Sequence, residues 1–506
     1  MKNKMIRKMV CIVLLVGLLS GCQEKEGKAQ GTELFPSHSP TPDFLEPFKA
    51  NLVPDYHSDL SRLQNASVYT IHIQVDDTLT LVTGNMDVLY TNQENEDLDH
   101  IYFKLIPNTS GNNLDIEKVT IQGKPVLFTL ENKNTTMRVP LNATLHPLEA
   151  IGIAISFSLR VPEVKGGNYG LLIYQDDILA LDSFFPIIPV YQDSRWQVED
   201  PPANADMIFT DAAFFTVTVD SPQRLVWVAS GVQDEVLQKG DRQIITFIAG
   251  PQRDFYLAAS AHFKSLSTSI NGTLITSYFP AGREDAGSLV LNSAVKALDV
   301  FNRRFGKYPF TELDLVSTPM NAGGMEYSGV AAISLDLYQV RVLDSGIPSS
   351  DYIEAVTAHE VAHQWFFNMV MNDQIDEPWL DEGMAQYATY LYYLDTSGEE
   401  GALPFHQTWS QRWSRVGNLP IPVGRPADAY TPREYSAIIY GRAPILIEKV
   451  AGTMGERAFN EFLNKFIKDN RWGIVDGHEF LSHAEASCEC ELEMIFREWV
   501  LEKENK

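Results

Sequence analysis

Two histidines and two glutamates in the second half of the chain have the types and the spacing of a hydrolytic zinc site. Residues 359–363 read His-Glu-Val-Ala-His, and Glu382 follows after eighteen further residues. On a helix, His359 and His363 lie one turn apart on one face, so both imidazoles can bind one zinc ion. Glu382 supplies a third ligand and leaves the fourth position open for water, as in catalytic zinc sites. Glu360 lies beside the metal without binding it, where it can act as general base on a zinc-bound water.

The segments that carry these residues are predicted to be two helices joined by a short loop. Residues 350–367 space their apolar and inward-facing side chains as a helix does, and Ser349 and Asp351 offer N-cap chemistry. A second helical run begins after Pro378 and continues through Leu391. Two helices in this order bring the later glutamate back beside the histidines. The sequence therefore predicts a zinc-dependent enzyme that hydrolyses peptide bonds.

The first half of the chain has the alternating pattern of β-strands, and helical spacing appears in the second half. Turn-forming residues separate several of the alternating runs, which indicates a large β-sandwich or saddle. A mixed region of strands and helices follows after Gly272. The chain is too long for one core, so we expect two or three domains. The expected strands are 68–75, 84–90, 151–161, 214–219, 243–248, 313–317 and 330–335, and the first expected helix is 287–305.

These motifs together resemble the aminopeptidase N family of gluzincin zinc metallopeptidases, which includes the membrane alanyl aminopeptidases. At the zinc site the shared features are the histidine–glutamate spacing and the run Trp-Leu-Asp-Glu-Gly. Upstream, Gly-Gly-Met-Glu-Tyr at 323–327 resembles the family's exopeptidase motif, Gly-x-Met-Glu-Asn. Downstream, residues 438–443 resemble the segment of the catalytic tyrosine, and residues 90–92 and 103–108 resemble the all-β first domain. The resemblance extends from Val68 to the end of the chain.

The resemblance implies a multidomain protein with an all-β saddle or sandwich at residues 65–262. An α+β, thermolysin-like catalytic domain with one zinc ion would follow at residues 263–506. The implied activity is the release of N-terminal residues from peptides. Two departures concern the cleft: Tyr327 replaces the usual Asn, and the chain ends where the catalytic domain would end, so we expect a short form without the family's C-terminal helical domain. A further amine-binding Gln or Glu should lie near residues 177–186, and it aligns with no single residue.

Glu326 is the residue to which the resemblance assigns the choice of cleavage position. Its carboxylate would pair with a free α-ammonium group, which confines cleavage to the first peptide bond. Gly323, Gly324 and Met325 would complete this substrate-binding segment, because glycines let an edge backbone approach a peptide and hydrogen-bond to it. An internal peptide segment would leave the buried carboxylate unpaired, which is costly.

The resemblance assigns stabilisation of the oxyanion to Tyr440. A phenol hydroxyl directed at the developing negative charge would supplement the zinc. The chain contains 20 tyrosines, and Tyr435 lies five residues earlier. Spacing alone therefore leaves Tyr435 open as the alternative.

Other functions compete with the aminopeptidase interpretation. A zinc endopeptidase with an open cleft would admit longer chains and would cleave N-acetylated peptides. A non-catalytic, zinc-dependent peptide-binding lipoprotein would need the metal ligands but no general base, and the intact Glu360 argues against it. A leukotriene-type epoxide hydrolase is disfavoured, because nothing in the sequence points to a lipid channel.

Residues 1–21 have the features of a bacterial lipoprotein signal peptide. A basic start precedes an apolar stretch at 9–19, which is short for a membrane span. Leu-Ser-Gly-Cys then resembles a lipobox, in which Cys22 is lipidated and becomes the mature N-terminus; a cleaved signal without lipid and an uncleaved anchor are the alternatives. Residues 22–64 contain several prolines and are expected to form an extended tether. We expect a protein of the cell envelope, anchored in the membrane by this lipid on the extracytoplasmic face.

The charge and the cysteines narrow the range of partners. The formal net charge of −26 becomes −30 without the signal peptide, which carries four basic residues and no acids. This excess of acids argues against nucleic-acid binding and against electrostatic adhesion to anionic lipid. The expected partners are peptides with a free N-terminus. Cys488 and Cys490 match no strong zinc pattern, so packing of a helix is expected there and a second metal site is the alternative.

Overall fold

The computed structural model describes residues 42–202, 205–339 and 348–501, and these belong to one compact unit, Phe35–Lys506. The predicted signal peptide, Cys22 and the first part of the predicted tether lie outside the described residues. Within the described residues, no helix is both long enough and apolar enough to cross a bilayer.

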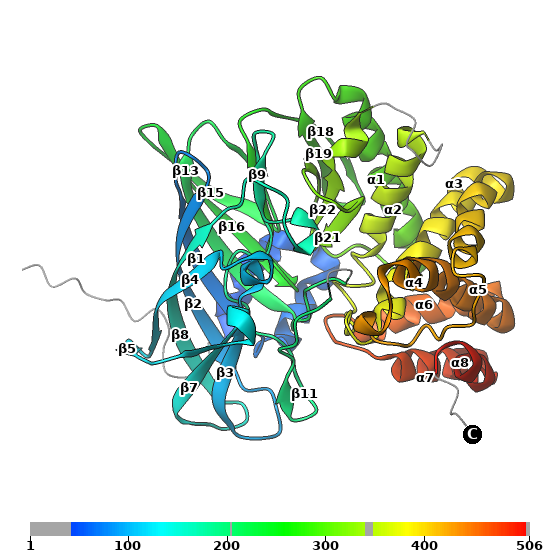
Figure 1. Cartoon of the computed structure of the whole chain (residues 1–506), viewed down its shortest axis with the longest axis horizontal. Helices are drawn as coiled ribbons and strands as arrows, with labels where there is room; N and C mark the ends of the chain where they lie inside the picture. The colour runs from blue at the N-terminus through cyan, green and yellow to red at the C-terminus, as the bar shows by residue number, and fades with distance from the viewer. Residues whose placement is uncertain (1–41, 203–204, 340–347, 502–506) are drawn as a thin grey trace, which may run out of the picture. The chain divides into compact units, whose positions relative to one another are not determined.

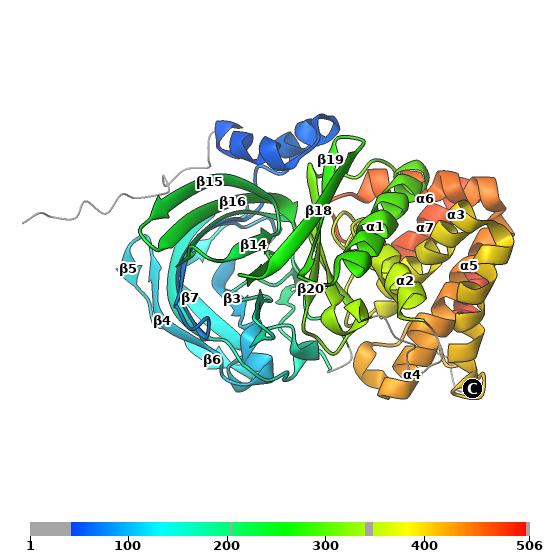
Figure 2. The same ribbon diagram turned by 90° about the horizontal axis from the view of Figure 1, so that it is seen from above.

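A curved eight-stranded sheet is the largest element of the first half (Figures 1 and 2). Its strands, in spatial order, are β15 (Val232–Lys239), β16 (Arg242–Gln252), β13 (Ala213–Pro222), β1 (Val68–Val75), β2 (Leu81–Thr91), β8 (Ala150–Arg160), β4 (Leu114–Ile121) and β5 (Lys124–Pro125). Only the pair β1–β13 is parallel. Buried and half-buried side chains alternate along β8, as the two-residue period of a strand requires.

Smaller sheets and short helical turns complete the first half. A four-stranded sheet has the order β14 (Val226–Ala229), β17 (Leu257–Ser260), β10 (Ile178–Leu181) and β9 (Ile173–Gln175). The remaining strands are β3 (Leu98–Lys104), β7 (Thr136–Leu145), β6 (Thr129–Glu131), β11 (Tyr191–Gln192) and β12 (Arg195–Trp196), and the turns are η3 (Ile106–Ser110), η4 (Asn132–Asn134) and η5 (Asn168–Gly170). The predicted β-rich first half is therefore confirmed.

The last part of the predicted tether is folded, so the expectation of an extended spacer is wrong for this part. Residues 42–62 form two 3₁₀ helices, η1 (Pro42–Asn51) and η2 (Pro54–Arg62), and η1 lies against β16 (Figure 2). Leu45 and Phe48 are buried, and the Phe48 ring lies 4.8 Å from the ring of Phe214. Burial of the apolar side chains that lie between the prolines is favourable. This gain in free energy outweighs the tendency of the prolines to keep the chain extended.

A mixed five-stranded sheet opens the second half. Its order is β18 (Phe263–Ile270), β19 (Thr273–Pro280), β20 (Glu312–Thr318), β22 (Val330–Ser334) and β21 (Gly324–Tyr327). Helix α1 (Glu284–Phe305) contacts β19 (Figure 2), and α2 (Ser349–Ala362) contacts β22 and β21. The segment around Glu326 forms the edge strand β21, which pairs antiparallel with β22.

Helices fill the rest of the second half and pack into one hydrophobic core with α1 and α2 (Figure 1). They are α3 (Pro378–Ser414), α4 (Pro432–Ala437), η8 (Ile438–Arg442, a π-helix), α5 (Ala443–Met454), α6 (Glu456–Asn470), α7 (Gly477–Cys488) and α8 (Glu493–Trp499), with the 3₁₀ turns η6 (Leu335–Tyr338) and η7 (Ala427–Ala429). The predicted start of the second helical run after Pro378 is confirmed.

Helix α2 ends earlier than the sequence pattern predicts. The expected end was Phe367, whereas the regular helix stops at Ala362 and His363 is its C-cap. The next turns are wider, because the amide of Asn368 donates to the His363 carbonyl at 3.0 Å. Tertiary packing explains the difference: Phe366 is buried in the helical core, whereas its neighbour Phe367 is buried in the core of the β-sheets.

Candidate metal centre

Three side chains from α2 and α3 converge with the geometry of a zinc site. The Nε2 atoms of His359 and His363 lie 3.2 Å apart, close to the ~3.3 Å edge of a tetrahedron with ~2.0–2.1 Å metal–nitrogen bonds. Glu382 Oε2 lies 3.0 Å from the first nitrogen and 3.7 Å from the second. Burial lowers the pKa of His359, whereas for His363 the carboxylate of Asp381 outweighs burial and raises the pKa; both imidazoles must be neutral at Nε2 to bind a metal. The donor set therefore fits one zinc ion.

The remaining ring nitrogen of His363 is fixed by outer contacts. Its Nδ1 lies 2.8 Å from Asp381 Oδ1 and 3.1 Å from the Phe366 carbonyl oxygen. The other Asp381 oxygen accepts a hydrogen bond from Gln374. A carboxylate on Nδ1 orients the ring and leaves Nε2 unprotonated for a metal. The motif search missed Asp381, although it directly precedes the ligand Glu382.

Glu360 is buried next to the ligands, and Gly324 makes room for it. Its Oε2 atom has no hydrogen-bond partner among the described residues. Burial, reinforced by the nearby charge of Glu326, raises the pKa of Glu360. A Cβ atom at Gly324 would lie 2.7 Å from the Glu360 carboxyl carbon and still closer to Oε1. Strand β21 can pass this carboxylate closely because Gly324 has no side chain.

Glu326 is directed from the edge strand toward the same centre. Its carboxylate and the donor atoms of Glu360 and His363 all lie within 4.8 Å of one another. Burial raises the pKa of Glu326 to about 8, and Gln374 Nε2 lies 3.4 Å from its Oε1. Met325 precedes it in β21 and is also buried, and Gly323 lies just before the strand. A cation placed beside Glu326 would restore its ionised form.

Tyr440 lies against the metal ligands, and Tyr435 lies behind it. The Tyr440 hydroxyl donates a hydrogen bond to Glu382 Oε1, the oxygen that does not face the histidines. Tyr435 is buried with its ring 6.1 Å from the Tyr440 ring. Tyr440 sits in the π-helix η8, and such wide turns frequently occur at functional sites.

Asp206 joins the centre from the β-rich half, and no motif in the sequence pointed to it. Its carboxylate lies within 4.8 Å of those of Glu326 and Asp381. Burial, together with these neighbouring carboxylates, raises the pKa of Asp206. A further amine-binding Gln or Glu from this half was expected near residues 177–186. Within that range, Asp182 is buried and hydrogen-bonded to Asn168 at 2.8 Å, and it belongs to none of the described clusters that could hold a metal.

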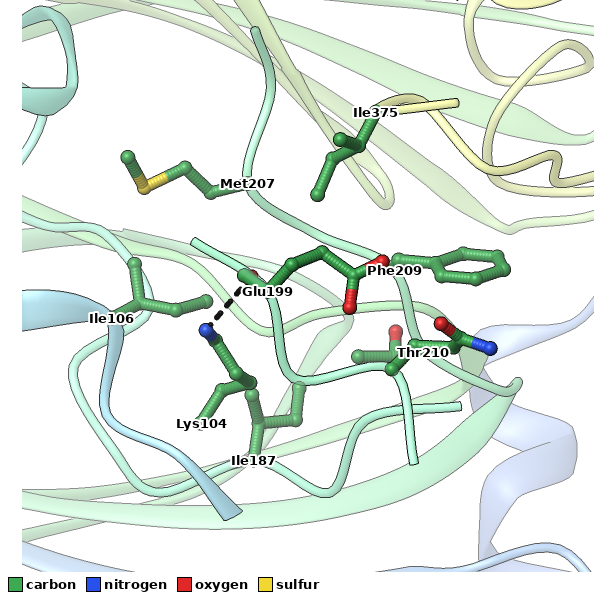
Figure 3. A pocket seen from close by; sticks show the side chains of 9 residues that line it. Lys104, Ile106, Ile187, Glu199, Met207, Phe209, Thr210 and Ile375 are labelled. Carbon is green, nitrogen blue, oxygen red and sulfur yellow. Dashed lines mark hydrogen bonds between the residues drawn. The ribbon is translucent and has the colours of Figure 1, made fainter. Parts of the chain in front are cut away.

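Lys104 holds residues 198–200, which precede Asp206 in the sequence. It lines a hollow (Figure 3), where its Nζ donates to the carbonyl oxygens of Val198 and Glu199, each at 3.0 Å. Asp200 Oδ1 accepts a third hydrogen bond from Nζ at 2.8 Å. All three donors of the ammonium group are used, so this lysine holds the segment in place and offers no free charge to a ligand.

The two C-terminal cysteines form a disulfide, Cys488–Cys490. Cys488 is the last residue of α7, and both side chains pack against the helical core. The metal-competent clusters among the described residues all lie at the centre built around α2, α3 and β21. The expected packing role of this segment is confirmed, and the alternative of a second metal site finds no support within the described ranges.

Comparison with known sequences matches most of the second half of the chain to one family model. Residues 289–499 match the peptidase family M1 domain. The aminopeptidase N of Acetobacter pasteurianus is 32% identical over 181 residues, which cover 35% of this chain and 51% of that protein. Aminopeptidase 2 of Candida albicans is 26% identical over 271 residues, covering 51% of this chain and 29% of that protein. The chain thus spans between about a third and a half of the length of these relatives.

Solved structures show the same fold over most of the chain. The M1 zinc metallopeptidase of Deinococcus radiodurans superposes with a TM-score of 0.64 and 19% identity, covering 86% of this chain and 94% of that chain. A glutamate-to-alanine mutant of that enzyme, bound to the substrate Tyr-Ser-Ala, superposes with a TM-score of 0.62. These likenesses confirm the predicted order of an all-β domain followed by an α+β, thermolysin-like domain.

Proposed function

Because this chain carries a peptidase family M1 domain, we propose that it is a zinc aminopeptidase that releases N-terminal residues from extracellular peptides. His359, His363 and Glu382 hold the zinc. The bound zinc supplies a Lewis acid for the scissile carbonyl. The aminopeptidase names of the sequence relatives support the activity, and the peptide bound to the Deinococcus enzyme supports the substrate class.

The chain's own acids and phenol carry the proton transfers and hold the developing charge. Glu360 accepts a proton from the attacking water and delivers it to the leaving amine. Its position supports this role, because Glu360 is buried beside the metal ligands and its Oε2 atom has no hydrogen-bond partner among the described residues, so this oxygen is free to accept a proton. The Tyr440 hydroxyl donates to the oxyanion after turning from Glu382, with which it is now hydrogen-bonded.

The observation that carries the exopeptidase assignment is the burial of Glu326 beside the general base. Its carboxylate lies within 4.8 Å of the Glu360 and His363 donor atoms, so a cation paired with it is held next to the reacting bond. A free α-ammonium group provides that cation, whereas an internal peptide segment does not. Asp206 faces the same position from the β-rich half and adds a second negative charge. Strand β21 offers its free edge to the substrate backbone.

The decisive experiment compares one peptide in two forms, free and N-acetylated, with a protein that starts after Cys22. Products are followed by mass spectrometry, with and without a chelator. Stepwise loss of residues from the free form alone, abolished by chelation, is the expected result. Internal cuts in both forms would assign an endopeptidase, and the absence of any cleavage would favour a zinc-dependent binding protein. As a check on the base, Glu360→Gln should abolish turnover while zinc stays bound.

We also propose that the chain is a lipoprotein of the bacterial cell envelope. The lipobox-like sequence that ends at Cys22 supports this location. Metabolic labelling with a palmitate analogue should mark the full chain and should fail to mark a Cys22→Ala variant. Labelling that persists in the variant would contradict the assignment.

A further inference from the structure

A second hollow adjoins Glu326, and we call it the acidic pocket. It lies where the four-stranded sheet of the first half packs on the five-stranded sheet. Four of its twelve lining residues are carboxylic acids, and none is a lysine, an arginine or a histidine. The acids are Asp182, Asp206, Asp254 and Glu326; apolar walls come from Leu171, Ile208, Met325 and Phe367. Its lining therefore combines apolar walls with negative charge.

Asp254 presents an unpaired oxygen to this pocket. Its Oδ1 accepts the amide of Ser328 at 2.9 Å, whereas Oδ2 is buried without a hydrogen-bond partner among the described residues. The side chain is only 3% exposed. The neighbouring Arg253 does not neutralise it, because its guanidinium donates to main-chain carbonyls, including those of Asn368 and Gly473. A buried carboxylate oxygen without a hydrogen-bond donor carries an uncompensated desolvation penalty. A ligand that donates a hydrogen bond to this oxygen would offset that penalty.

Asp182 adds a second acid to the pocket. Asp182 accepts from the side chains of Asn168 and Ser183 but has no cationic partner among the described residues. Burial raises the pKa of Asp182 to about 6 and that of Asp254 to about 7, with repulsion by Asp182 contributing to the latter. Tyr327 also lines the pocket. A cation in the pocket would meet two carboxylates.

The spacing along the chain distinguishes this pocket from the ammonium site at Glu326. Ser328, which holds Asp254, is two residues beyond Glu326, and two residues of extended chain span ~6–7 Å. A lysine carries its ammonium group at the end of a four-carbon stem, which can bridge a separation of this order. Neither Asp182 nor Asp254 belongs to the described clusters that could hold a metal ion.

We propose that the acidic pocket receives the cationic side chain of the substrate's first residue, a lysine or an arginine, with Asp254 and Asp182 as its charge partners. The α-ammonium group of the same residue then lies between Glu326 and Asp206. This inference rests on the proposed aminopeptidase function and adds a substrate class to it.

The test compares aminoacyl-coumarin substrates that differ only in side-chain charge: lysine, Nε-acetyl-lysine and norleucine. For the wild type we expect kcat/KM to be at least ~10-fold higher for lysine than for either neutral analogue, the size of one charge-assisted hydrogen bond. Asp254→Asn and Asp182→Asn should each lower this ratio while hydrolysis of norleucine continues. Glu94→Gln removes a charge beside a different hollow and should leave the ratio unchanged.

The outcomes separate this inference from the proposed function. Equal rates on lysine and norleucine in the wild type overturn the inference and leave the aminopeptidase intact, and this result needs no variant to fold. A lysine preference that survives both Asp→Asn variants also overturns it. A calcium-dependent loss of the preference would assign the pocket to a metal ion instead. No hydrolysis of any of the three substrates refutes the proposed function itself.

Discussion

The contact between Gly324 and Glu360 allows a quantitative test of where the general base must lie. In Gly324→Ala the added Cβ would lie 2.7 Å from the Glu360 carboxyl carbon, whereas ordinary contacts begin at 3.4 Å. The carboxyl group must therefore retreat by about 0.7 Å, the difference between these two distances. A misplacement of ~1 Å at a reacting group can cost ~100-fold in rate, so we expect kcat to fall by ~30–100-fold.

The assay measures kcat and KM on a norleucine substrate, the zinc content and the midpoint of thermal unfolding. Gly452→Ala, on α5, is the matched control, because its Cβ would meet no atom within 4 Å. We expect this control to keep nearly full activity. Wild-type kcat in Gly324→Ala would refute the positional requirement on Glu360, and loss of zinc in that variant would place the effect on the ligands instead of the base.

Three further predictions concern single hydrogen-bonding groups. Tyr440→Phe should lower kcat by ~100-fold, the usual cost of one oxyanion donor, with KM and zinc content retained; an unchanged kcat would shift the role to another group. Asp381→Asn should weaken zinc binding ~10–100-fold, because it removes the charged partner of His363, as chelator competition would measure. Asp59→Asn should destabilise the fold by about 2–3 kcal/mol, since Asp59 accepts from Arg471 and from the indole of the next residue. Burial opposes this effect, but these hydrogen bonds lower the pKa of Asp59. The difference in free energy of unfolding between wild type and variant should therefore persist above ~pH 4 and vanish as the pH falls through the lowered pKa. A difference that is independent of pH would contradict the reasoning.

The catalytic centre was predictable because its signal is local in sequence. Two histidines one helical turn apart define a metal-binding face by themselves, and Glu382 lies near the start of the next helix. Gly324 was expected to allow a peptide to approach, and the structure adds a second reason, the space for Glu360. The contact of Tyr440 with Glu382 depends on the π-helical turn of η8, which no spacing rule anticipates.

The acids from the first half were not predictable, because their meeting depends on the packing of sheets far apart in sequence. Asp182 follows β10 and Asp254 precedes β17, and these strands pair in the four-stranded sheet. Asp206 lies in an irregular segment before β13. A lone acid in a strand or loop carries no periodic signal. The prediction of an extended tether near the N-terminus failed for a related reason. Prolines indicate an extended chain only when the apolar residues beside them are not buried in a core.

The division of the acidic pocket between the two halves of the chain has a consequence for how the protein can diverge. The proposed metal ligands, Glu360 and Tyr440 all belong to the second half, whereas three of the four acids that line the acidic pocket belong to the first. Under the proposed function, changes in the first half would alter which peptides are accepted without disturbing the hydrolytic chemistry, so selectivity and catalysis would be able to evolve separately.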